Sequence, residues 1–135
     1  TYSVSEKFFV NRALHKVSSP KRGDVIVFKT SASDSAALHI RRVIGLPGET
    51  VQVKDGKIYI NGKVYEENGA YQDMTDGGLA NSAITLESGE YFVLGDNRNN
   101  SEDSRFSDIG NISKKYIVGK VWFTVSPKNK IGFIK

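Results

Sequence analysis

Short runs of branched and aromatic residues, separated by turn-forming residues, recur along the whole of this 135-residue chain. Such runs are typical of β-strands, whereas the apolar spacing of an amphipathic helix is almost absent. The sequence therefore predicts a mostly β fold of antiparallel sheets and hairpins with very little helix. Strands are expected at residues 8–10, 25–28, 40–44, 51–53, 58–60, 91–94 and 117–125.

Turn residues mark where several of these strands end. Asp55-Gly56 and Asn61-Gly62 predict hairpin turns, because both dipeptides favour the positive φ of a type I′ loop. In Gly45-Leu46-Pro47-Gly48, proline and glycine stand where a type II turn needs them. Residues 66–82 contain few apolar side chains, so we expect a long and mobile excursion there.

Length and composition limit the organisation of the chain. With 135 residues, 39% of them hydrophobic, it suits one domain over residues 1–135 and is too short for two. There is no cysteine, and the two histidines, His15 and His39, do not have the spacing of metal ligands. We therefore expect neither a metal site nor a cofactor.

Positive charge gathers near the C-terminal end. The net charge is +4, and the residues after Asp108 include six lysines and no acidic residue. With Trp122, Phe123 and Phe133, this segment fits a face held near anionic lipid head groups, and it fits equally a solvated edge over core aromatics. No nucleic-acid-binding motif accompanies the charge, so nucleic acid is not an expected partner.

The most polar stretch of the chain is residues 95–105, which directly follow an apolar run and are called the polar loop below. Side chains so dense in charge, hydroxyl and amide groups do not form an apolar core layer, so they interact with one another, with solvent or with a reaction site. A surface loop in which Asp96, Asn97 and Asn100 bond their own backbone explains the same composition. The position directly after a strand favours a site held on a rigid scaffold.

Three further segments precede the polar loop in order: residues 21–28 (KRGDVIVF), 40–49 (IRRVIGLPGE) and 57–63 (KIYINGK). Together with the polar loop they resemble the signature boxes of type I signal peptidases, and the resemblance covers nearly the whole chain. Arg22-Gly23-Asp24 also spells an integrin-binding tripeptide. It leads directly into a predicted strand, however, and the family resemblance explains it better.

The resemblance implies a serine nucleophile and a lysine that takes its proton as general base. A lysine does this only when desolvation lowers its pKa toward neutrality. The lysine position, the first of two basic residues before Val43-Ile44-Gly45, is Arg41 in this chain. A guanidinium stays protonated under ordinary conditions, so Arg41 does not accept a proton, and we expect the chain to be inactive as it stands.

Other residues match the groups that support the base in this family. By resemblance, Ser101 is the hydroxyl that orients the base. Arg42 is the expected partner of Asp96, and Asp103 is the expected partner of Arg105 in a supporting salt bridge. The full set of expected structural support is Arg42, Asp96, Asn97, Asp103, Ser104 and Arg105.

The nucleophile is expected outside the chain. Thr1-Tyr2 and Val10-Asn11-Arg12 align with landmarks that follow the family's Ser-Met-X-Pro-Thr-Leu box, which places the serine roughly four residues before Thr1. Ser3 and Ser5 are not followed by Met-X-Pro, so we interpret them as loop residues.

Substrate binding is expected on Leu38-His39-Ile40, because the family pairs an extended peptide with the strand that leads into the lysine position. The implied partners are the signal peptides of secreted precursors, with pilins as one class of precursor. His39 is an alternative base, but it shares a strand face with Arg41 only at a distance of two residues, so a catalytic His39 is not favoured.

No segment reaches the roughly 18 apolar residues that span a bilayer, and no signal peptide is present. The chain begins at Thr1-Tyr2 without methionine, so we expect that a preceding region has been removed. The resemblance implies a location at the membrane surface, on the extracytoplasmic face of the plasma membrane, with an upstream transmembrane helix as anchor.

Three hypotheses from different classes remain. The first is a signal peptidase domain whose general base has become Arg41, which the nearly complete polar loop favours. The second is a natural non-catalytic relative that binds secreted or pilin-like precursors and helps to assemble them at the membrane. The third is a β-rich adhesive or structural domain, which explains the strands but not the four motifs. We adopt the signal-peptidase-like architecture.

Overall fold

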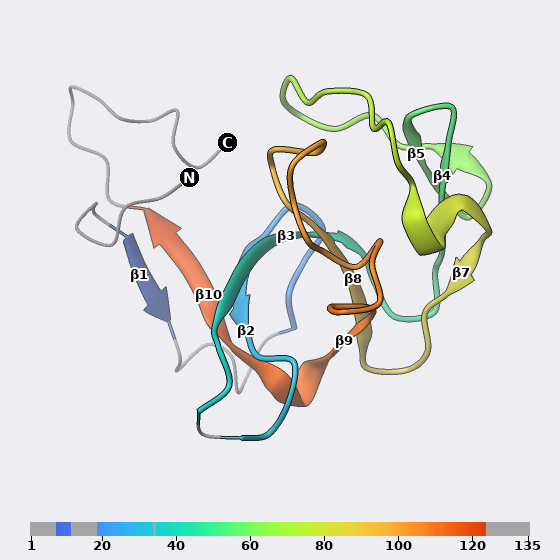
Figure 1. Ribbon diagram of the computed structural model, residues 1–135. Coiled ribbons are helices and arrows are strands. Elements are labelled where there is room, and N and C mark those ends of the chain that lie inside the picture. Colours follow the sequence, from blue (N-terminus) through green and yellow to red (C-terminus); the bar gives the residue numbers. More distant parts are fainter. Residues whose placement is uncertain (1–7, 12–18, 34, 124–135) are drawn as a thin grey trace, which may run out of the picture.

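The computed structural model of this protein describes residues 8–11, 19–33 and 35–123, which form two antiparallel sheets (Figure 1). From one edge to the other, the first sheet contains β1 (Phe8–Asn11), β10 (Ile117–Phe123), β2 (Val25–Phe28), β3 (His39–Gly45), β8 (Glu90–Leu94) and β9 (Ile112–Ser113). The second contains β6 (Lys63–Val64), β5 (Lys57–Ile60), β4 (Thr50–Lys54) and β7 (Ile84–Thr85). The predicted mostly β fold is confirmed.

All seven predicted strands are present, and within the described residues their ends differ from the prediction by at most one residue. The last of them is described to Phe123, and residues 124–125 of the prediction lie outside the described residues. The structure adds β6, β7 and β9, which have two residues each and are too short to show alternation in the sequence. In the described part of the chain, the helices are the 3₁₀ segments η1 (Gly78–Asn81) and η2 (Lys114–Tyr116).

The predicted turns have the expected backbone. Asp55 and Gly56 have φ of 53° and 79°, and Asn61 and Gly62 have φ of 53° and 84°, as a type I′ loop requires. In the proline-containing turn Gly48 has φ of 87°, the value that a type II turn needs. These turns connect β4 to β5, β5 to β6 and β3 to β4.

β3 and β8 lie between two apolar clusters and contribute to both. On β8, Phe92 and Leu94 pack into one cluster while Tyr91 and Val93 pack into the other, because successive side chains of a strand point to opposite faces. The first cluster joins β3 and β8 to the second sheet and contains Ile44, Val51, Val53, Ile58, Met74, Ala80, Leu86, Phe92 and Leu94. The second contains Ile26, Phe28, Val43, Tyr91, Val93, Ile112 and Ile117.

The excursion at residues 66–82 has no strand, and η1 is its one regular element. It nevertheless contributes buried residues, with Met74 at 6% exposure and Ala80 at 0% in the first cluster. Its path runs beside the polar loop (Figure 1). The mobility expected from its composition stays a prediction.

An ion pair fixes the turn that leads from β3 to β4. Arg22 donates to both carboxylate oxygens of Glu49 at 2.6 and 2.8 Å, and to the carbonyl of Ile44 at 3.0 Å. Glu49 also accepts the N–H of Leu46 at 2.8 Å. The hydrogen bond from Arg22 lowers the pKa of Glu49, and the same contact raises the pKa of Arg22. The segment before β2 is thereby attached to the turn between the two sheets.

Glu49→Gln is expected to lower the melting temperature at pH 7 and to have a smaller effect at pH 3. The folded pKa of Glu49 lies below its ordinary value of 4.5. The ion pair therefore contributes stability that is fully present above that value and is lost as the pH falls through the lowered pKa. Thermal melts of parent and variant at both pH values measure this difference, and Glu66→Gln, at an exposed carboxylate, is the matched control. An equal loss at pH 7 and pH 3 would contradict the assignment.

Candidate functional site

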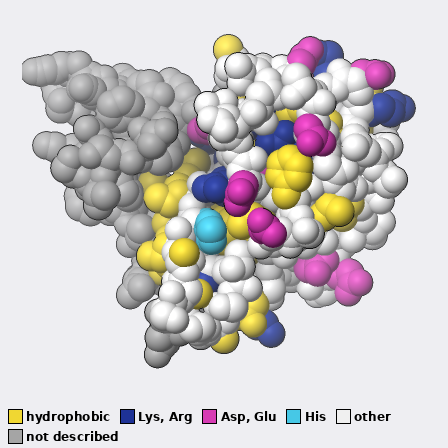
Figure 2. Space-filling view, in the orientation of Figure 1, with side chains coloured by type: hydrophobic (Ala, Val, Ile, Leu, Met, Phe, Trp, Pro, Cys, Tyr) yellow, Lys and Arg dark blue, Asp and Glu magenta, His cyan; other side chains and the backbone are white. Residues whose placement is uncertain are grey.

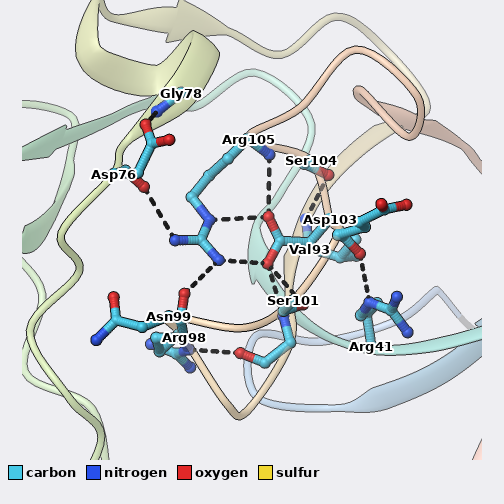
Figure 3. Close-up of polar contacts among 12 residues, drawn as sticks. Arg41, Asp76, Gly78, Val93, Arg98, Asn99, Ser101, Asp103, Ser104 and Arg105 are labelled. Carbon is cyan, nitrogen blue, oxygen red and sulfur yellow. Dashed lines mark hydrogen bonds and ion pairs between the residues drawn. The ribbon is translucent and has the colours of Figure 1, made fainter.

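The site residues predicted from the sequence come together where the polar loop lies against β3. β8 pairs with β3 as far as the register Arg42↔Leu94, and the chain then leaves the sheet at Gly95. It returns at Ser104, whose N–H donates to the Val93 carbonyl at 3.1 Å. Ten residues of irregular backbone between these points are held by side chains rather than by a ladder (Figure 3).

Asp103 and Arg105 form a buried ion pair at the centre of the polar loop (Figure 3). Asp103 is 0% exposed and Arg105 is 2% exposed. Arg105 Nε lies 2.9 Å from Asp103 Oδ1, and its Nη2 lies 2.9 Å from Oδ2. Arg105 also donates to the carbonyls of Asp76 and Arg98 at 3.0 and 2.6 Å. The pair thus has the additional hydrogen bonds that a buried pair needs.

Ser101 contacts the same carboxylate. Its Oγ donates to Asp103 Oδ2 at 3.1 Å, and the N–H of Gly95 donates to that oxygen at 3.0 Å. Ser101 lies directly against Gly95, because a Cβ on Gly95 would overlap the serine Oγ and come 2.6 Å from its Cβ. The same Cβ would lie 3.6 Å from Arg41 Cδ. Ser101 and the side chain of Arg41 therefore both lie close to Gly95.

Arg41, at the base position implied by the resemblance, binds backbone carbonyls. Its Nε donates to the carbonyl of Glu102 at 2.7 Å, and its Nη1 donates to the carbonyl of Ile40 at 2.8 Å. Such acceptors suit a guanidinium, which has donors and no acceptor. The hydrogen bond of the Ser101 hydroxyl goes to Asp103 and not to Arg41.

Arg42 and Asp96, the second pair expected from the sequence, are in contact. Arg42 Nε and Nη2 lie 2.9 and 2.8 Å from the two carboxylate oxygens of Asp96, and Nη1 donates to the carbonyl of Gly23 at 2.9 Å. The ring of Tyr71 lies 5.9 Å from the Arg42 guanidinium. Burial, followed by the charge of Asp96, raises the pKa of Tyr71. Arg42 thus connects β3, the polar loop and the excursion.

Asn97 and Ser104, which the sequence groups as support, have different surroundings. Ser104 is buried, and its Oγ accepts the N–H of Val93 at 2.9 Å, which fixes the loop to β8. Asn97 is exposed, and its carbonyl accepts the N–H of Asn100 at 3.0 Å. Asn97 therefore belongs to a local turn, as in the surface-loop interpretation.

The segment expected to bind substrate is paired along one side. In the β2 ladder, His39 lies opposite Phe28 and Ile40 lies opposite Val27, while the β8 ladder begins only at Arg42. Leu38 is 57% exposed beside them. The His39 ring stacks on Phe28 at 5.5 Å between centroids. Burial, followed by the charge of Arg41, lowers the pKa of His39.

Arg98 was not singled out in the sequence, yet it is 1% exposed and connects three segments. It forms two hydrogen bonds to Glu67 at 2.5 and 2.8 Å, and its Nε donates to the carbonyl of Gly95 at 2.8 Å. Its guanidinium lies 4.1 Å from the centre of the Tyr71 ring. Arg98 and Glu67 are 31 residues apart in the sequence. No local pattern in the sequence therefore indicates that they pair.

Arg22 and Asp24 of the tripeptide Arg22-Gly23-Asp24 both have partners within the chain. Arg22 pairs with Glu49, and Asp24 lies 3.3 Å from Lys120 Nζ and accepts the N–H of Lys21 at 2.8 Å. Both charged side chains are partly buried. This geometry disfavours the adhesive interpretation.

The space-filling view shows acidic, basic and hydrophobic side chains close together across the face drawn (Figure 2). Among the residues that the structure describes, no helix is long and apolar enough to cross a membrane, and no three acidic or histidine side chains gather as metal ligands do. Of the C-terminal basic segment, Lys114 donates to Ser19 Oγ at 3.0 Å, and Lys120 pairs with Asp24. Lys128, Lys130, Phe133 and Lys135 lie outside the described residues.

The structure is a mostly β domain of two antiparallel sheets, in which the polar loop lies against β3. The family model described as signal peptidase, peptidase S26, matches residues 1–126. The chain therefore belongs to the signal peptidase family. Removal of signal peptides from secreted precursors is the function that this membership supports.

Individual relatives agree with this assignment. The chain is 36% identical to signal peptidase I T of Bacillus subtilis, over 97% of its own length and 70% of that protein's. It is 38% identical to signal peptidase I of Leptolyngbya laminosa, over 98% of the chain and 66% of the relative. A crystal structure of a signal peptidase I from Enterococcus faecalis superposes with a TM-score of 0.58 at 32% identity, covering 77% of this chain and 97% of that one.

Asp103→Ala and Arg105→Ala are each expected to destabilise the fold by about 3–5 kcal/mol, because either change leaves the other charge buried without its partner. The matched control is Lys57→Gln, which breaks the exposed pair Lys57–Asp73 and should change stability little. Urea unfolding measures all three. Unfolding midpoints of the two buried variants equal to that of the control would mean that the polar loop is only a solvated surface loop.

Gly95→Ala is expected to displace Ser101 and to destabilise the polar loop by about 1–3 kcal/mol, because the added Cβ overlaps the serine side chain. Ser101→Gly removes the overlapping atoms, so the double variant should recover most of that loss relative to Ser101→Gly alone. The coupling is measured with a double-mutant cycle of unfolding free energies. Strictly additive single effects would show that the two residues do not share this space.

Proposed function

We propose that this chain is a signal peptidase domain in which Arg41 occupies the position of the general-base lysine, so that the chain does not cleave precursors as it stands. The observation that carries the proposal is the placement of Arg41 on β3, where its side chain and Ser101 both lie close to Gly95. The position of Arg41 and the residues around it match those expected for the general base of the family, but arginine stands where the family has lysine.

The chemistry of the position supports inactivity. A base must have a lone pair to accept the serine proton, and a guanidinium has none to offer at ordinary pH. Two carbonyl oxygens accept hydrogen bonds from Arg41, at 2.7 and 2.8 Å, so its N–H groups act as donors here. The serine itself is proposed to lie in the box that precedes Thr1 in the family.

The rest of the site supports a domain that derives from an active enzyme. Near Arg41, three contacts of the polar loop join residues that match the family's support of the base. These are the buried pair Asp103–Arg105, the pair Arg42–Asp96 and the hydrogen bond from Ser101 to Asp103. These groups fit the orientation of a base that the chain no longer has. Such complete support favours a disabled signal peptidase over the adhesive alternative.

A non-catalytic member of the family that binds secreted or pilin precursors is the second candidate. The two hydrogen bonds from Arg41 to backbone carbonyls favour this candidate. They are the contacts expected if arginine is the natural residue at this position. In both cases the proposed partners are signal peptides, and the proposed location is the extracytoplasmic face of the plasma membrane. No cofactor is proposed.

Arg41→Lys is expected to restore cleavage of a secretory precursor in a chain extended upstream by a Ser-Met-X-Pro-Thr-Leu box. The lysine returns a side chain that can lose its proton, and a general base contributes about 100-fold or more to the rate. Cleavage is followed by gel mobility and by mass spectrometry of the products. The parent Arg41 in the same extended chain is the matched control.

Two results would contradict the proposal. Equal cleavage by the Arg41 and Lys forms would show that this position is not the base. Absence of cleavage by a revertant whose melting temperature matches the parent's would argue against a disabled enzyme and would leave the non-catalytic candidate.

A further inference from the structure

Arg41 differs from the other arginines whose side chains the structure describes. Each of the other four forms an ion pair with a carboxylate: Arg22 with Glu49, Arg42 with Asp96, Arg98 with Glu67, and Arg105 with Asp103. Arg41 binds only the carbonyls of Glu102 and Ile40, through Nε and Nη1. Within residues 19–33 and 35–121, its charge therefore has no carboxylate partner, and its Nη2 has no hydrogen-bond acceptor.

The described side chains next to Arg41 include a group able to hydrogen-bond, His39, and no carboxylate that forms an ion pair with Arg41. His39 lies two residues earlier on the same face of β3 and is held by stacking on Phe28. Burial, followed by the charge of Arg41, lowers the pKa of His39. Glu102 is exposed, and its charge is felt at His39, but it makes no ion pair with Arg41. Asp103, the other nearby acid, is fully buried against Arg105.

The pairing of β3 with β2 and β8 limits how far along β3 an added peptide strand can pair. β2 occupies one edge of the strand from His39 to Arg42. β8 occupies the opposite edge only from Arg42 onward. Among the described strands, none pairs with this opposite edge at residues 39–41, so an extended peptide can pair there. It cannot continue past Arg42, where β8 takes over, so one end of the peptide or a reacting bond lies beside Arg41.

We propose that Arg41, assisted by His39, forms a binding site for the C-terminal carboxylate of an extended peptide on the open edge of β3. The permanent charge of the guanidinium selects the carboxylate end of the peptide over its ammonium end. This inference rests on the proposed function, because a signal peptide that has already been cleaved ends in a carboxylate, and in that function Arg41 occupies the position beside the cleaved bond. Replacement of lysine by Arg41 thus turns a proton-accepting position into one that retains a product-like peptide.

The test compares two probes on the full 135-residue chain. The first is the hexapeptide acetyl-Leu-Leu-Ala-Ser-Ala-Ala with a free C-terminal carboxylate, and the second is the same peptide with a C-terminal amide. Calorimetric titration at pH 7 should give about 10-fold tighter binding of the free acid, as expected for one charge-assisted contact. Arg41→Gln should bring the ratio of the two affinities to about one, and Arg41→Lys should keep part of the preference.

Glu102→Gln is the matched variant for charge. It keeps the backbone carbonyl that accepts from Arg41 and removes the nearby negative charge, so the preference for the free acid should rise. A third probe, the amide with aspartate as its last residue, distinguishes a side-chain carboxylate from a terminal one. Tighter binding of this probe than of the free acid would overturn the assignment to a peptide terminus.

Equal binding of acid and amide by the parent chain overturns the inference while leaving the proposed function intact, because precursor-like peptides still bind. Failure of both probes to bind overturns it as well. The proposed function is tested separately, by cleavage with the Arg41→Lys revertant. A preference for the free acid that survives in Arg41→Gln would place the anion site on another group, and would also count against the inference.

Discussion

The buried carboxylate of Asp103 is the group on which the rest of the site depends. It accepts hydrogen bonds from the N–H of Gly95, which follows β8, from the hydroxyl of Ser101, and from Nε and Nη2 of Arg105. A charge that is completely removed from water is tolerated only with this degree of compensation. Because its partners come from the start, middle and end of the polar loop, one carboxylate determines the path of the whole segment.

Two arginines of the polar loop also bind residues of the excursion at residues 66–82. Arg105 donates to the carbonyl of Asp76, and Arg98 pairs with Glu67, so both arginines connect the polar loop to residues 66–82. The ring of Tyr71 lies near two guanidinium groups, at 4.1 Å from that of Arg98 and 5.9 Å from that of Arg42. Cation–π attraction of this kind is strongest when the groups are desolvated. The excursion is therefore part of the support around β3.

The sequence predicts best what depends on neighbours along the chain. Alternation and turn dipeptides predicted all the longer strands, and the type I′ turns at Asp55 and Asn61 follow from local backbone preference. The pairing of Asp103 with Arg105 is also local. By contrast, the contact of Arg98 with Glu67 depends on how the excursion folds back, which no periodicity encodes. The pairing of His39 with β2 likewise depends on the sheet order, and among the described strands none pairs with the opposite edge of β3 at residues 39–41.

The chemistry of Arg41 follows from the difference between a donor and an acceptor at one position. A lysine at this place needs an environment that disfavours its charge, so that it can give up a proton. An arginine needs acceptors, and the structure supplies the carbonyls of Glu102 and Ile40. In the proposed function, a lysine here would take a proton from a nucleophile, whereas the proposed role of Arg41 is to hold the carboxylate end of a peptide.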